Sequence, residues 1–208
     1  MKKSLSRPID ASPGDDYWYY YWGPYLFQTH VDKRLSQELL ERGKKLKTRY
    51  TQQLAGAIKN EFSYPDTSFF LSYFKKYVEL YLVGYRRYTG KSQFNPPFQM
   101  KELWINFQRQ HEYNPVHIHM NCTHSFVLYL KVPKILKKEF ARNNTRHPGP
   151  GSITFFYGEP NDWAISQHNF FPEENMLFIF PSNVRHEVPA FKSNVTRISV
   201  AGNFTLQI

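Results

Sequence analysis

The sequence predicts an α+β, mainly β protein, in which a sandwich or jelly roll of short strands is braced by helices near the N-terminus. Three observations predict this class. Apolar residues recur at helical spacing in the first half of the chain, short strand-like runs fill the second half, and the stretches between those runs are too short for helical crossovers. A sandwich or jelly roll is therefore favoured over a parallel α/β sheet, which needs such crossovers.

The parts of the chain are expected in a definite order. Residues 1–16 are polar and carry two prolines and a glycine, which predicts a flexible arm. Residues 17–208 are expected to form a single domain, with helical support over about 32–90 and a jelly-roll core over about 98–208.

Periodicity locates the elements within this domain. The aromatic residues 17–22 suit a strand or a docked segment, and residues 25–31 suit a strand. Helices are expected over 32–46 and 67–87, the second being amphipathic because its apolar residues lie three or four apart. Core strands are expected at residues 101–108, 126–132, 152–157, 176–180 and 197–204.

Composition limits the environment and the partners of the chain. Cys122 is the one cysteine among 208 residues, and no apolar run is long enough to cross a membrane, so a cytoplasmic protein without membrane segments is expected. The net charge of +10 suits an acidic partner such as nucleic acid. The basic residues are dispersed, however, and no base-reading motif accompanies them, so a solvated basic surface is the simpler interpretation. Nothing in the sequence indicates the oligomeric state.

The sharpest local feature is the pair of histidines in His117-Ile118-His119. In an extended segment residues i and i+2 project to the same side, so two imidazoles at this spacing can converge on one metal ion. His186 is the candidate third ligand, because it follows a strand that a jelly roll can return beside the first pair. The alternative is that these are ordinary histidines with hydrogen-bonding roles.

Arg197 strengthens the metal interpretation. It lies eleven residues after His186 on the next expected strand, and alternation places Ser199 on the same face. A guanidinium group and a hydroxyl group on one face can bind a carboxylate together.

An ordered series of motifs resembles the 2-oxoglutarate- and iron(II)-dependent oxygenase superfamily, and more narrowly the prolyl-hydroxylase-like oxygenases of marine bacteriophages, which also carry a segment like Leu54-Ala55-Gly56. The motifs are Trp104–Asn106, Tyr113–His119, Leu128–Leu130, Gly151–Phe155, Phe180–Ser182, His186–Pro189 and Arg197–Ser199.

The resemblance implies a cupin-like double-stranded β-helix that uses Fe(II), 2-oxoglutarate and O2, with ascorbate as a candidate reductant. It assigns the metal to His117, His119 and His186. It assigns the distal carboxylate of 2-oxoglutarate to Arg197, assisted by Ser199 and by Tyr113 or Asn106.

His119 departs from the general pattern of the superfamily, which has Asp or Glu at this position. The site is then either a three-histidine centre or one that Glu112 or Glu187 completes. His124 is close enough in sequence to be a residue that hydrogen-bonds to the metal ligands and orients them. Phe126 stands where close relatives tend to show Gly, which suggests a narrowed substrate pocket.

The substrate is the least determined part of the prediction. The resemblance makes a peptidyl proline the first candidate among protein or small-molecule substrates, with the basic residues 134–150 as a mobile loop over the site. The alternative function is a non-catalytic jelly roll, either a metal-binding module or a structural protein of a virus particle.

Overall fold

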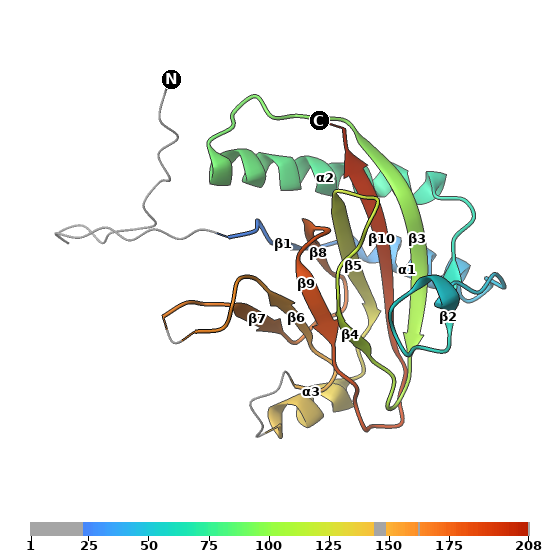
Figure 1. The fold of residues 1–208 in the computed structure, drawn as a ribbon. Coiled ribbons are helices and arrows are strands. Elements are labelled where there is room, and N and C mark those ends of the chain that lie inside the picture. Colours follow the sequence, from blue (N-terminus) through green and yellow to red (C-terminus); the bar gives the residue numbers. More distant parts are fainter. Residues whose placement is uncertain (1–22, 144–148, 162, 208) are drawn as a thin grey trace.

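The computed structural model describes residues 23–143, 149–161 and 163–207, which form two antiparallel sheets that lie face to face (Figure 1). The larger sheet has the strand order β1 (Phe27–His30), β8 (Met176–Pro181), β5 (His124–Lys131), β10 (Arg197–Leu206), β3 (Phe98–Gln108) and β2 (Glu61–Ser63). The smaller sheet has the order β4 (Asn114–His117), β9 (Arg185–Val188), β6 (Ile153–Phe156) and β7 (Gln167–Phe170). The mainly β class and the jelly-roll arrangement are thus confirmed. The predicted arm at residues 1–16 and the aromatic residues 17–22 lie outside the described residues.

Two helices cover the outer face of the larger sheet. They are α1 (Lys33–Gly43) and α2 (Ser68–Thr89). α1 begins after Asp32, whose side chain accepts a hydrogen bond from the Arg34 backbone N–H, and α2 ends at Gly90, which adopts the left-handed conformation that glycine tolerates best. α2 is amphipathic, as its periodicity predicts, and its buried face carries Phe70, Phe74, Tyr77, Val78, Tyr81 and Leu82.

Strand alternation divides the apolar side chains of the larger sheet between two cores. On β5, Phe126, Leu128 and Leu130 face the helices, whereas Tyr129 faces the smaller sheet. On β8, residues 177 and 179 face the helices and residues 176, 178 and 180 face the smaller sheet. The period of two therefore decides which residues of each strand lie between the sheets, where a ligand site can form.

Two sequence expectations are wrong in detail. Residues 134–150 are not a continuous loop, because Lys134–Ala141 form helix α3, which buries Leu136. Glu139 of this helix accepts hydrogen bonds from the backbone N–H groups of Lys192 and Ser193. These contacts dock α3 on the segment before β10.

Phe126 does not narrow the space between the sheets with its ring. The ring packs on the helix side of β5, with centroids 4.5 Å from Phe74 and 5.4 Å from Phe70. Gly202 on the neighbouring strand β10 makes room for it, since a Cβ at that position would lie 2.6 Å from the ring. The large residue is therefore accommodated in the helix-covered core.

The short 3-10 turn η1 (Thr51–Gln53) and the following residues close one side of the space between the sheets. Gly56 lies so close to β4 that a Cβ there would be 1.7 Å from Asn114 Oδ1. Within the described part of the chain, no helix combines the length and the apolar character that a membrane crossing requires.

Candidate metal centre and its cavity

The structure brings the three predicted histidines together. His117 on β4 lies opposite His186 on β9, and His119 follows two residues later. One ligand nitrogen from each ring lies within 4.8 Å of the others. The strand pairing that aligns β4 with β9 therefore builds the cluster from residues about 70 positions apart in the chain.

Backbone carbonyls orient two of the rings. His117 Nδ1 lies 2.7 Å from the carbonyl oxygen of Pro115, and His186 Nδ1 lies 2.9 Å from that of Val184. Because a carbonyl oxygen only accepts, each Nδ1 carries the proton and each Nε2 keeps its lone pair for a metal ion. The backbone N–H of His119 donates to the carbonyl oxygen of Ser182, which anchors the chain at the third histidine.

Burial keeps the three imidazoles neutral. It lowers the pKa of His117, lowers that of His119 to about 4 with a further contribution from His117, and lowers that of His186 well below its usual range. Three unprotonated nitrogen donors within one small cluster fit a divalent transition metal, including iron(II).

The carboxylate alternatives do not join this cluster. Both oxygens of Glu112 are engaged elsewhere, accepting hydrogen bonds from the backbone N–H groups of Lys59 and Arg109. Glu187 follows His186 directly on β9, so alternation directs it to the opposite face of the strand. Among the described residues, the group of side chains that can hold a metal ion consists of the three histidines.

A cavity of about 410 Å³ lies between the sheets beside the histidines. Arg197 and Ser199 reach it from β10, Asn106 reaches it from β3, and Tyr129 reaches it from β5. Asn106, Ser199 and Tyr129 are paired across adjacent strands, so they form one row across the floor of the cavity.

This end of the cavity presents hydrogen-bond donors. Arg197 is buried, and one of its terminal nitrogens donates to the carbonyl oxygen of Gly151 at 2.8 Å. Within the described ranges, neither its Nε nor the hydroxyl group of Tyr129 has a hydrogen-bond partner. The Arg197 guanidinium carbon lies 5.2 Å from the centroid of the Tyr129 ring. A buried cation beside an unused hydroxyl group is suited to bind a carboxylate.

Two predicted site residues lie elsewhere. The side chain of Tyr113 does not line the cavity, and the residue is 46% exposed. His124 faces the helices, with Nε2 2.9 Å from the Tyr81 hydroxyl and Nδ1 2.8 Å from the Thr123 hydroxyl, so it does not contact the three histidines. Tyr129, in contrast, lines the cavity although it was not predicted as a site residue. Alternation along the strand that contains Ser125 and Tyr129 was the signal that could have identified it.

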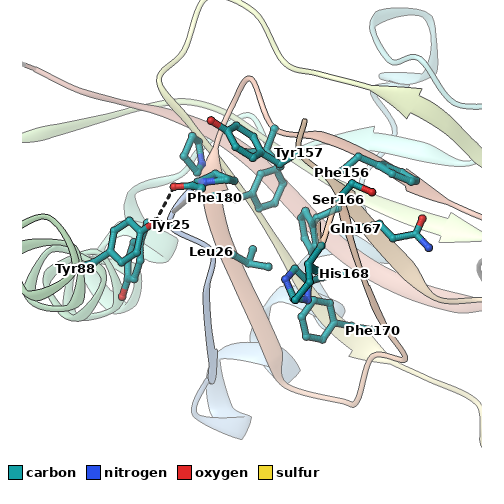
Figure 2. A pocket seen from close by; sticks show the side chains of 16 residues that line it. Tyr25, Leu26, Tyr88, Phe156, Tyr157, Ser166, Gln167, His168, Phe170 and Phe180 are labelled. Atoms are coloured by element: carbon teal, nitrogen blue, oxygen red, sulfur yellow. Dashed lines mark hydrogen bonds between the residues drawn. The ribbon is translucent and has the colours of Figure 1, made fainter. Parts of the chain in front are cut away.

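A second cavity, of about 310 Å³, lies behind the metal cluster and is mostly aromatic (Figure 2). Tyr25 and Tyr88 lie on one side of it, Phe170 on the other, and the Tyr88 hydroxyl donates to the carbonyl oxygen of Gly23. Phe180 lines both cavities, and its ring centroid lies 4.8 Å from that of His186. Phe180 therefore lies between His186 and this apolar space.

The comparison with protein families identifies the part of the chain that carries the site. Residues 102–203 match the family described as "Putative 2OG-Fe(II) oxygenase", and this range contains the three histidines, Arg197 and Ser199. Residues 102–203 belong to the 2OG-Fe(II) oxygenases. The oxygenase is thus an enzyme that uses iron(II) and 2-oxoglutarate, and the non-catalytic alternative is not supported.

Solved structures share the fold of the oxygenase. A Pseudomonas putida prolyl-4-hydroxylase is 16% identical, with 88% of this chain and 93% of that chain covered and a TM-score of 0.51. The viral collagen prolyl hydroxylase of Paramecium Bursaria Chlorella virus-1 is 10% identical (88% and 96%, TM-score 0.53). A prolyl hydroxylase of Trichoplax adhaerens is 12% identical (88% and 83%, TM-score 0.55). These likenesses establish the double-stranded β-helix. No curated protein matches the sequence.

Proposed function

We propose that His117, His119 and His186 hold the iron(II) of this oxygenase. We further propose that Arg197, with Ser199 and Tyr129, binds the distal carboxylate of 2-oxoglutarate. The observation that carries the proposal is the convergence of three neutral imidazoles and a set of unused donors on one buried cavity.

The unused donors support the carboxylate assignment. A buried donor without a partner costs about 1–3 kcal/mol, so Arg197 Nε and the Tyr129 hydroxyl favour a ligand that accepts from both. Asn106 Nδ2 lies 3.4 Å from Ser199 Oγ and can donate to it, which leaves the Ser199 hydroxyl hydrogen for the same ligand.

Bound iron(II) and 2-oxoglutarate supply oxidation by O2, in which 2-oxoglutarate is converted to succinate and CO2 and a substrate C–H bond is hydroxylated. The protein contributes position and exclusion of water. The carbonyl groups of Pro115 and Val184 fix the rings of His117 and His186, and the aromatic rings of Phe155 and Phe180 pack against His186.

The substrate is proposed only as a protein or a small molecule. A peptidyl proline is the first candidate to test, because structures that share the fold are prolyl hydroxylases, one of them in complex with a peptide. Another structure of this fold, HygX from Streptomyces hygroscopicus, is described with hygromycin B bound, which supports testing small molecules as well.

The proposal is tested by ligand-dependent stability with Mn(II) in place of iron(II), because Mn(II) is not oxidised in air. We expect 2-oxoglutarate at 100 times its Kd to stabilise the Mn(II)-loaded protein by about 2.7 kcal/mol. Arg197→Gln should lose this stabilisation and still bind Mn(II), whereas His186→Ala should lose both. The exposed Arg185→Gln is the matched control. Equal stabilisation of wild type and Arg197→Gln would contradict the carboxylate assignment.

A further inference from the structure

The cavity has a second polar end, on the side of β2. Glu61 lies on β2 directly opposite Asn106 on β3, and both residues line the cavity. Glu61 is 0% exposed, and neither of its carboxyl oxygens has a hydrogen-bond partner in the part of the chain that the structure describes. A buried carboxyl group without partners is costly, so its retention at a cavity wall points to a ligand.

The neighbours of Glu61 are also acceptors. Asn106 Nδ2 faces the Ser199 hydroxyl oxygen, which leaves the amide oxygen of Asn106 without a partner among the described residues. Asn114, on β4, lines the same cavity, and its amide oxygen, which packs close to Gly56, likewise has no described partner. Among the cavity-lining groups that lack a described partner, those of Glu61, Asn106 and Asn114 are oxygens, whereas Arg197 Nε and the Tyr129 hydroxyl can donate.

The electrostatics of this end are negative. Glu112 is held near Glu61 by its two backbone hydrogen bonds. Burial, reinforced by the charge of Glu112, raises the pKa of Glu61 to about 8. Glu102, which also lines the cavity, lies four residues before Asn106 on β3 and does not belong to this end. Although the chain carries a net charge of +10, the cavity wall at this end lacks positive charge among the described residues.

We propose that Glu61, Asn106 and Asn114 form a subsite for a cationic group of the substrate that carries several N–H donors, such as the ammonium group of a lysine side chain. The inference rests on the proposed function, because it divides one cavity between two ligands. The donor end takes the carboxylate of 2-oxoglutarate, and the acceptor end takes the cation.

The chemistry of the two ends excludes the reverse assignment. A phosphate or carboxylate group near Glu61 would meet a carboxyl group, the charge of Glu112 and two amide oxygens, none of which donates when Glu61 is ionised. A substrate ammonium group supplies three donors and one positive charge, so it can donate to three of these four oxygens and favours the ionised form of Glu61. Because this subsite would bind a cation, the basic surface of the chain would not select the substrate at this site.

The test compares blocked peptides that are identical except for a central lysine, arginine, norleucine or proline. Their binding to the Mn(II)- and 2-oxoglutarate-loaded protein is measured by calorimetry at pH 7 in two buffers of different ionisation enthalpy. We expect the lysine or arginine peptide to bind at least about 10-fold more tightly than the norleucine peptide, since a buried charge-assisted pair exceeds 1.4 kcal/mol. We also expect proton release on binding, because Glu61 ionises beside the cation.

The variant Glu61→Gln is expected to lose both the preference for the cationic peptide and the proton release, and to keep its affinity for 2-oxoglutarate. The exposed Glu173→Gln is the matched control and should behave as the wild type. If the wild type itself does not bind 2-oxoglutarate, the proposed function is contradicted, and this result is distinct from failure of the cation subsite.

The comparison of peptides with the wild-type protein can by itself contradict the proposed subsite. The test therefore does not depend on whether Glu61→Gln folds. Norleucine or proline peptides that bind as tightly as the lysine and arginine peptides would contradict it. Failure of both cationic peptides and of n-butylammonium to bind would contradict it too. A preference for lysine that persists in folded Glu61→Gln would place the cation elsewhere.

Discussion

His117 and His186 lie directly opposite each other on β4 and β9, with their ring centroids 4.2 Å apart. Each ring is fixed through Nδ1 by a carbonyl oxygen two residues earlier in the chain. The arrangement presents two Nε2 atoms to the same point before any ion binds. In the proposed site, a metal ion would therefore meet a preorganised pair, and His119 would complete the cluster.

Replacement of either paired histidine should abolish metal binding. Removal of a residue that only hydrogen-bonds to a metal ligand typically weakens metal binding by roughly 10- to 100-fold. We expect His117→Ala and His186→Ala, which remove a ligand itself, to weaken Mn(II) binding by more than this. Calorimetry with Mn(II) measures this, with the exposed His30→Ala as the control. Wild-type affinity in both cluster variants would show that the metal binds elsewhere.

Tyr129→Phe should weaken the binding of 2-oxoglutarate without lowering the stability of the ligand-free protein. The hydroxyl group has no partner within the described residues, so its removal should not destabilise the protein without ligand. In the Mn(II)-loaded protein we expect the affinity for 2-oxoglutarate to fall by about 10-fold, the effect of one lost hydrogen bond to a charged group. The exposed Tyr157→Phe is a matched control. Unchanged affinity in Tyr129→Phe would remove this residue from the co-substrate site.

The long elements and the short strands β1 and β6 could be predicted from the sequence, whereas four other short strands could not. Helix α2 spans 22 residues and repeats its apolar face several times, and the strands β3, β5 and β10 span eight to eleven residues. The strands β2, β4, β7 and β9 span only three or four residues, too few to establish a period. Their place is fixed by pairing with strands that are distant in the chain.

The same difference explains which site residues the sequence identified. His117 and His119 could be found because their spacing in an extended segment is itself a signal, and Arg197 lies on a strand long enough for alternation to apply. Glu61 lies on β2, and only the pairing with β3 turns its side chain into the cavity. Tyr113 was predicted from the resemblance, as an alternative to Asn106, although the fold exposes it.

Gly202 is expected to resist substitution for a packing reason. A Cβ at this position would lie 2.6 Å from the backbone oxygen of Glu102 and from the Phe126 ring. We expect Gly202→Ala to lower the free energy of unfolding by about 1–3 kcal/mol, the usual effect of overpacking a core. Urea unfolding measures this change. Gly23→Ala, where a Cβ makes only ordinary contacts, should change little, and an equal effect of both substitutions would contradict the explanation.

Glu61 should make stability depend on pH in an unusual direction. Its pKa rises from an ordinary value of 4.5 to about 8 on folding, so between these values the folded state binds more protons than the unfolded state. The stability contributed by the protonated form is therefore lost as pH rises through this window. Relative to Glu61→Gln, the ligand-free wild type should lose about 1–2 kcal/mol of unfolding free energy between pH 6 and 8. Urea unfolding at both pH values tests this, and parallel curves for the two proteins would show that Glu61 is ionised throughout.

The most direct test of the metal and co-substrate assignment is an anaerobic titration of the purified protein with iron(II) and 2-oxoglutarate, followed by visible absorption. Chelation of the metal by 2-oxoglutarate gives a weak charge-transfer band. We expect this band in the wild type, a much weaker band in Arg197→Gln at the same 2-oxoglutarate concentration, and none in His186→Ala. Folded, iron-loaded wild-type protein that gives no band would contradict the assignment of this cavity to iron(II) and 2-oxoglutarate.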